Sequence, residues 1–131
     1  MTNGKDKQDE SISAFRKISD EDIQRMLASD HLEDLLLLSL RVGEYFQNWK
    51  KAQDICIHLA THPNEEVRVN AALGLAYIAR TKGKLEKHMV KPVLLKLLDN
   101  CIAFRWRIID SLEDINFYLD WHIGEKALRN K

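Results

Sequence analysis

The sequence has few of the residues that interrupt helices and few that could cross-link the chain. Its 131 residues include only five glycines and two prolines, whereas 31% of them are charged. This composition excludes a glycine-rich or proline-rich chain and favours an all-helical protein. The two cysteines, Cys56 and Cys101, lie inside apolar helical patterns. We therefore expect buried free thiols in a reducing compartment, not a disulfide framework.

Long apolar runs are also missing. The most apolar stretch, LEDLLLLSL, is too short to span a membrane and is bordered by charged residues. The N-terminal residues TNGKDKQDES are polar and do not resemble a signal peptide. The sequence thus predicts a cytoplasmic protein without a membrane partner.

The net charge is zero, but the charged residues are unevenly distributed along the chain. Residues 18–66 carry 4 basic and 10 acidic side chains, and residues 67–109 carry 9 basic and 2 acidic ones. Residues 110–131 carry 3 basic and 5 acidic side chains. This distribution indicates either solvated helix faces or separate acidic and basic patches that steer a partner.

Motifs that would carry catalysis or bind a cofactor are missing. There is no phosphate-binding loop, nucleophile elbow or dinucleotide fingerprint. His58 and His62 share a helix face, but the sequence places no third metal ligand near them. Asp110, Glu113 and Asp114 form an acidic cluster, which is more often a solvated face than a cation site. We expect no enzyme, no cofactor and no metal site.

The clearest predicted helix lies between Pro63 and Gly83. Pro63 cannot continue a preceding helix, Asn64 is a favourable N-cap, and Gly83 can adopt the left-handed C-cap conformation. Two apolar stripes run along nearly opposite sides of this helix: Val67, Ala71, Leu75 and Ile78 on one, and Val69, Leu73 and Tyr77 on the other. A helix that is apolar on both sides must pack between neighbours.

The chain repeats the first of these stripes in both directions. A forward shift of 37 residues superimposes it on four apolar residues: Phe104, Ile108, Leu112 and Ile115. A backward shift of 35 residues superimposes its first three members on leucines: Leu32, Leu36 and Leu40. Repeats of this length, each ending in a similar helix, predict a helical solenoid.

The pattern resembles HEAT repeats over about residues 20–120. The residues that carry the resemblance are the turn Pro63-Asn64, the pair Val67-Arg68 and the run AALGL at 71–75. Pro92 adds to it, since the first helix of such repeats often carries a proline. The resemblance implies an all-α fold, a short right-handed α-solenoid of about three HEAT-like antiparallel helix pairs. It places a single domain at 13–120, between a disordered tail at 1–12 and a C-terminal tail at 121–131.

The remaining helices are expected at 20–28, 31–46, 49–61, 85–98 and 102–120. Ser19 and Asp30 are the expected N-caps of the first two, and the third begins near Asn48. A turn is expected at Asp99-Asn100. Pro92 either kinks the helix at 85–98 or delays its start.

The resemblance implies a non-catalytic protein-binding module, because stacked helix pairs expose their second helices on one surface. Short bacterial proteins of this type include immunity proteins, so we expect the chain to bind and neutralise a cognate bacterial toxin. The alternative is an adaptor or scaffold in a larger complex. Basic residues interleaved with Phe104 and Trp106 would also suit nucleic acid, but the zero net charge argues against it.

The candidate partner-binding side chains are those on the second helices that the core stripes leave over. They are Asp34, Arg41, Glu44, Asn70, Tyr77, Arg107, Asp110, Glu113 and Asp114. A cationic partner would contact the acidic groups at the two ends, with Tyr77 as a central aromatic anchor. In the alternative interpretation, Tyr77 is buried between repeats and the acidic groups are only solvated.

Overall fold

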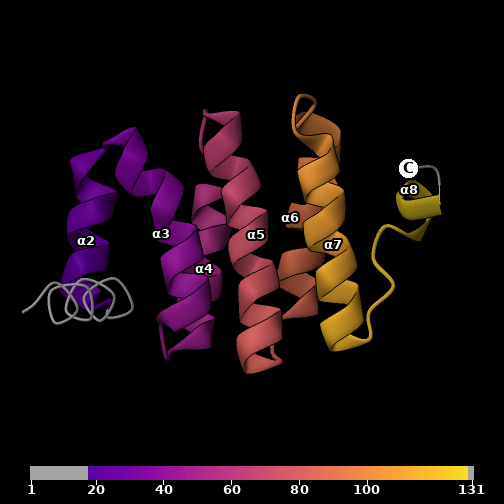
Figure 1. The fold of residues 1–131 in the computed structure, drawn as a ribbon, viewed down its shortest axis with the longest axis horizontal. Coiled ribbons are helices and arrows are strands. Elements are labelled where there is room, and N and C mark those ends of the chain that lie inside the picture. Colours follow the sequence, from indigo (N-terminus) through magenta and orange to yellow (C-terminus); the bar gives the residue numbers. More distant parts are fainter. Residues whose placement is uncertain (1–17, 130–131) are drawn as a thin grey trace, which may run out of the picture.

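The computed structural model describes residues 18–129, and every regular element among them is an α-helix. The helices are α2 (Asp20–Ser29), α3 (Leu32–Tyr45), α4 (Trp49–Leu59), α5 (Glu65–Lys82), α6 (Lys87–Asn100), α7 (Arg105–Leu119) and α8 (Glu125–Arg129). Figure 1 shows α3, α5 and α7 side by side, with α4 and α6 behind them. The expected all-α class is therefore confirmed. The expected tail at 1–12 lies outside the described residues.

Helix α5 has the boundaries and the central position that the sequence predicts. The Asn64 side chain accepts a hydrogen bond from the Val67 backbone N–H at 3.1 Å, and Gly83 ends the helix with φ 66°. Ten of the 18 residues of α5 are buried. The helix packs against α3 on one side, α7 on the other and α4 behind, so apolar side chains cover most of its circumference.

The buried positions of α3, α5 and α7 recur at spacings of 36 and 37 residues. In α5 they include Ala71, Gly74, Leu75 and Ile78, and 37 residues later α7 buries Ile108, Ser111, Leu112 and Ile115. Thirty-six residues earlier, α3 buries Leu35, Leu38, Ser39 and Val42. The predicted forward shift is thus confirmed, and the predicted backward shift of 35 is wrong by one residue.

The error of one residue moves the assumed core stripe of α3 by about 100° around the helix. Leu32 is 45% exposed, and Leu36 and Leu40 are only half-buried. Leucines lie on every side of α3, so apolarity alone does not distinguish the two registers. The contact with α5 decides between them.

Helices α3 and α5 approach each other through their backbones. A Cβ atom on Gly74 would lie 2.6 Å from the Ser39 carbonyl oxygen and 2.8 Å from the Cys56 Sγ. A Cβ atom on Gly43 would lie 2.5 Å from the Gly74 carbonyl oxygen. Because both glycines lack that atom, the two helices can cross at this short distance.

The start of α6 is held by a side chain from another helix. Gln53 of α4 is fully buried, its Oε1 accepts from the Glu86 backbone N–H at 2.7 Å, and its Nε2 donates to the Glu86 carboxylate at 2.9 Å. Helix α6 consequently begins at Lys87, five residues before Pro92, so the proline does not delay its start. The turn expected at Asp99-Asn100 is also wrong, because α6 continues through Asn100.

Asp30 differs from its expected role as the N-cap of α3. It ends α2 in the left-handed conformation, with φ 55°, and α3 follows His31, whose side chain makes no capping hydrogen bond. The Ser19 cap of α2 and the Asn48 cap of α4 are confirmed by hydrogen bonds from Asp22 N–H and Lys51 N–H. Asp30 therefore serves the preceding helix, where its short polar side chain tolerates a positive φ.

The segment expected as a C-terminal tail folds back onto α7 in its described part, residues 121–129. Ile123 is only 2% exposed, and its backbone N–H and C=O both bond to the Asn116 side chain, at 3.0 and 2.9 Å. The Lys87 ammonium lies 5.7 Å from the centroid of the Trp121 ring. The domain thus extends past the predicted boundary at residue 120.

The expectation of buried free thiols is confirmed for both cysteines. Burial raises the pKa of the Cys56 thiol to about 12, because a thiolate would lose its hydration at the contact between α4, α3 and α5. Burial also raises the pKa of Cys101, whose Sγ lies 3.3 Å from the Asn100 Oδ1. Both thiols should be unreactive while the protein is folded.

The close contact at Gly74 predicts that alanine at this position destabilises the protein, the reverse of its usual effect inside a helix. Alanine in place of glycine normally stabilises a helix interior by about 1 kcal/mol. Gly74→Ala should instead destabilise the protein by about 1–3 kcal/mol, because the added methyl group would collide with the α3 backbone. The measurement is the urea midpoint at an unchanged m-value. A variant as stable as the parent would show that the two helices separate at little cost.

The register of α3 can be tested with two adjacent leucines. Leu38 is fully buried, so Leu38→Ala should lower the free energy of unfolding by about 2–5 kcal/mol. Leu37 is 44% exposed, so Leu37→Ala should change it by about 0.5 kcal/mol or less. Equal losses in the two variants would contradict the spacing of 36 residues.

Candidate partner-binding face

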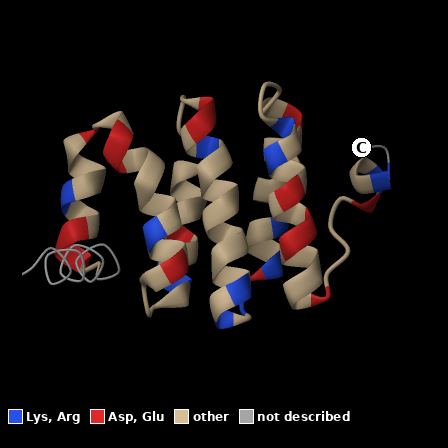
Figure 2. Cartoon of the chain, viewed as in Figure 1, with Lys and Arg blue, Asp and Glu red and all other residues tan. Residues whose placement is uncertain are grey.

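The expected partner-binding residues all lie on α3, α5 and α7, which form one layer of the structure (Figure 1). Figure 2 shows charged residues along α3 and α7, whereas the middle of α5 between them carries none. We call this layer's outer surface the front face. It combines an uncharged centre with charged flanks.

A groove between α5 and α7 occupies one half of the front face. Its volume is about 160 Å³, and its lining comprises Val69, Leu73, Trp106, Arg107, Asp110, Ser111 and Asp114. The Trp106 side chain is 63% exposed, which is a large apolar area for a residue beside a groove. Asp110 and Asp114 are exposed beside it. The groove thus offers an aromatic surface next to two carboxylates.

A second groove lies between α3 and α5. Its volume is about 330 Å³, and it is lined by Leu40, Glu44, Tyr45, Tyr77 and Arg80. The Arg80 guanidinium lies 4.7 Å from the centroid of the Tyr77 ring and forms an ion pair with Glu44. Tyr77 is half-buried, with its ring on the groove wall. Its exposure thus lies between the two alternatives, an aromatic anchor for a partner and a residue buried inside the protein.

Asn70 is used inside the protein. It is 7% exposed, and its Nδ2 donates to the Leu36 carbonyl oxygen at 2.8 Å. Its Oδ1 accepts from the Arg107 guanidinium at 2.6 Å. Asn70 thereby links α3, α5 and α7, and it holds Arg107 against α5. Of these two expected contact residues, only Arg107 also lines a groove.

Asp34 and Arg41 lie toward α2 and line neither groove. The Asp34 carboxylate accepts a hydrogen bond from the Ser29 hydroxyl at 3.0 Å. The Arg41 guanidinium lies 3.8 Å from the Met26 Sδ, at the contact between α2 and α3. Their contacts indicate a structural role at the first helix pair.

The carboxylates of α7 interact with one another. Partial burial raises the pKa of Asp114 above its usual range, and the nearby Asp110 and Glu113 carboxylates raise it further. The Arg80 guanidinium on α5 opposes this rise. Because the neighbouring carboxylates disfavour the charged form of Asp114, a cationic group near them would stabilise it.

Some equivalent positions of α3, α5 and α7 are not among the expected partner-binding residues. The sets of equivalent positions are Leu37, Leu73 and Asp110; Arg41, Tyr77 and Asp114; Glu44, Arg80 and Phe117. The expected set omits Leu37, Leu73, Arg80 and Phe117, of which Leu73 and Arg80 line the two grooves. Phe117 is 80% exposed and adds a second exposed aromatic ring on α7.

Neither the metal site nor the nucleic-acid surface considered from the sequence is brought together in the described residues. Among residues 18–129, no three His, Cys, Asp or Glu side chains lie close enough to hold a metal ion. The His62 Nδ1 accepts the Asn64 backbone N–H at 3.0 Å and so belongs to the turn before α5. The basic stretch considered for nucleic acid is divided between two surroundings. Its lysines Lys91 and Lys96 are exposed on α6, whereas its aromatic residue Trp106 lies beside the carboxylates of the front face.

No family model, curated protein or solved structure matches this chain. Between residues 18 and 129, no helix is both long enough and apolar enough to cross a membrane.

The acidic cluster predicts that the pKa of Asp114 is higher than that of Asp22. In an NMR titration of the carboxyl carbons, the pKa of Asp114 should lie above 3.8. Asp110→Asn should lower the pKa of Asp114 because it removes a like charge, and Arg80→Gln should raise it. Asp22 is the internal reference, with a pKa below 3.8 because its carboxylate accepts the Ser19 backbone N–H.

The same shift has a defined effect on stability. The native pKa of Asp114 is above its unfolded value, so the native state binds more protons between the two values. The contribution of Asp114 to stability should thus fall as the pH rises through this interval, and Asp114→Asn should remove that decrease. An Asp114 that titrates at or below Asp22 would contradict the described geometry of the cluster.

Proposed function

We propose that this chain is a non-catalytic protein-binding module with the architecture of a short right-handed α-solenoid of HEAT-like repeats. The repeats would be three antiparallel helix pairs: α2 with α3, α4 with α5, and α6 with α7. The recurrence of buried positions at 36 and 37 residues supports this assignment. So does Arg68, which donates to the His62 carbonyl oxygen at 2.9 Å and to the Asn100 Oδ1 at 3.2 Å, linking the turn before α5 to the end of α6.

The observation that carries the function is the composition of the front face. Two grooves flank the uncharged middle of α5, and exposed carboxylates border one of them. Leu73, Tyr77 and Trp106 would supply apolar contacts, and tyrosine and tryptophan are frequent among the few residues that carry most of the binding energy of an interface. Asp110 and Asp114 would attract a cationic surface and accelerate association. The partner class that fits is a protein with a basic patch around an apolar centre.

Within this class, we propose a bacterial toxin that the chain binds and neutralises in the cytoplasm. An acidic face suits this role because it can cover a basic active site and keep substrates out. The alternative is an adaptor or scaffold, in which the same face holds a partner without inhibiting it. A nucleic-acid binder is a weaker third candidate, since the exposed aromatic Trp106 lies beside carboxylates that repel phosphate.

The test reverses the charge of the α7 carboxylates. The double variant Asp110→Lys with Asp114→Lys should slow association with a partner captured from the native host by about tenfold or more and weaken its salt dependence. Glu21→Lys with Asp54→Lys is the matched control, because both residues are exposed on other helices. Circular dichroism would verify that each variant remains folded.

The outcomes separate the proposed functions. Slower association in the α7 variant alone supports the front face as the interface. A loss in the control alone would move the interface to α2 and α4. Stoichiometric loss of the partner's toxic activity supports immunity, and retained activity supports an adaptor. Salt-sensitive binding of DNA or RNA by the purified protein would favour the third candidate.

A further inference from the structure

A pocket among the described residues lies away from the front face, where the helix stack ends. Helices α6, α7 and α8 enclose about 460 Å³, a volume within the range of small-molecule sites. The apolar part of its lining comes from Leu95, Leu98, Ile109 and Ala127. None of the residues that line this pocket also lines a front-face groove. The pocket is therefore a separate feature of the fold.

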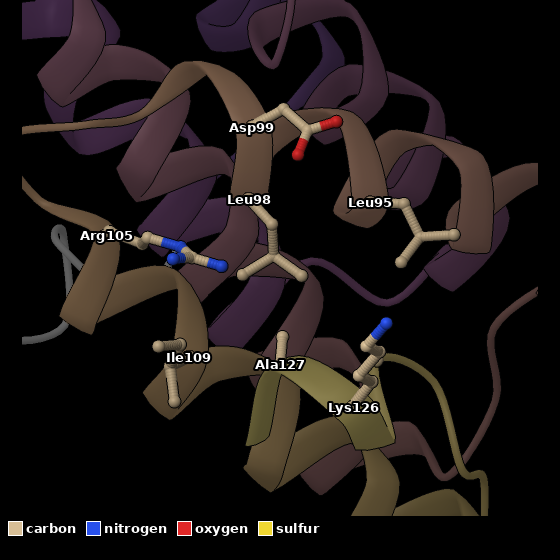
Figure 3. Close-up of a pocket in the computed structure, with 8 residues that line it drawn as sticks. Leu95, Leu98, Asp99, Arg105, Ile109, Lys126 and Ala127 are labelled. Atoms are coloured by element: carbon tan, nitrogen blue, oxygen red, sulfur yellow. The ribbon is translucent and has the colours of Figure 1, made fainter. Parts of the chain in front are cut away.

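The pocket exists because the chain reverses direction after α7. Ile123 is anchored by Asn116, and Gly124 has a φ of 68°. A Cβ on Gly124 would lie 2.6 Å from the Leu112 Cδ2, so glycine allows the chain to pass close to α7. This path places α8, with Ala127, opposite Leu98 (Figure 3).

Two cationic side chains extend into the pocket from opposite sides. Figure 3 shows the Arg105 guanidinium directed toward Leu98, and the Lys126 ammonium approaching from α8. Within residues 18–129, neither cation makes a hydrogen bond or an ion pair. Asp99 is the one carboxylate in the lining. The lining thus has a net charge of one positive unit above an apolar floor.

We propose that this pocket binds a carboxylate attached to an apolar group. The two cations would hold the carboxylate, and the leucine, isoleucine and alanine side chains would cover the apolar part. Asp99 would repel a second negative charge, which disfavours dianions such as phosphate monoesters. Two kinds of molecule share this chemistry: a free fatty acid and the C-terminal residue of a peptide. The proposal does not depend on the function proposed for the front face.

The test uses the full chain with labelled leucine and isoleucine methyl groups. Decanoate or N-acetyl-leucyl-leucine, added separately, should shift the methyl signals of Leu95, Leu98 and Ile109, whereas decanol and decyl phosphate should shift them much less. A response to decanoate alone would identify a fatty-acid site, and a response to the dipeptide alone a peptide site. No shift with either carboxylate, or equal shifts with decanol, would overturn the proposal.

Two variants test the cations separately. Arg105→Gln and Lys126→Gln should each weaken binding of the active probe by about tenfold or more, since each removes a charge-assisted hydrogen bond. Lys91→Gln is the matched control, because Lys91 is exposed on α6 and lines no pocket described above. All three positions are exposed, so the fold should tolerate the change. Binding unchanged in both pocket variants would overturn the assignment of the cations.

Discussion

The close crossing of α3 and α5 is the constraint on which the rest of the layer depends. At Gly43 and Gly74 the two backbones leave no room for a methyl group. The small residues Ser39 and Ala71 extend this contact, and the Ser39 hydroxyl is buried there without a hydrogen-bond partner among the described residues. Longer side chains such as Leu40 and Tyr77 must then spread to the outside, where they form the walls of a groove. The apolar walls of this groove are thus a consequence of the crossing.

Side-chain to backbone hydrogen bonds determine how consecutive helix pairs are aligned. Asn70 holds the Leu36 carbonyl and Arg107, Arg68 holds the turn before α5 and Asn100, and Gln53 caps α6. Each is half-buried or buried and bonds to a residue that is about 30 positions or more away in sequence. Apolar packing alone would allow neighbouring helices to slide, because it is non-directional. These bonds have directional geometry, so they specify one alignment.

The sequence predicted most of what local chemistry determines and missed what depends on distant contacts. The N-cap expected at Asp30 and the turn expected at Asp99-Asn100 are local features that it assigned wrongly. The caps Ser19, Asn48 and Asn64 and the core stripe of α5 need only neighbouring residues, and all were found. The register of α3 was wrong because leucines surround the helix and only the contact with Gly74 distinguishes their sides. Likewise, the start of α6 depends on Gln53, which is 33 residues from Glu86. The candidate site followed the same rule: acidic residues of α7 lie on the front face, whereas Asn70 is used to join helices.

The sets of equivalent positions separate what α3, α5 and α7 share from what they do not. One set of equivalent core positions is aliphatic in all three helices, as in Val42, Ile78 and Ile115, whereas another holds Leu38, Gly74 and Ser111. Positions that line the front-face grooves also change their chemistry from helix to helix, as in Glu44 and Arg80. Solubility alone would be met by any polar residue at such a position. Similar helices with varied outer residues thus place different chemical groups side by side on one face.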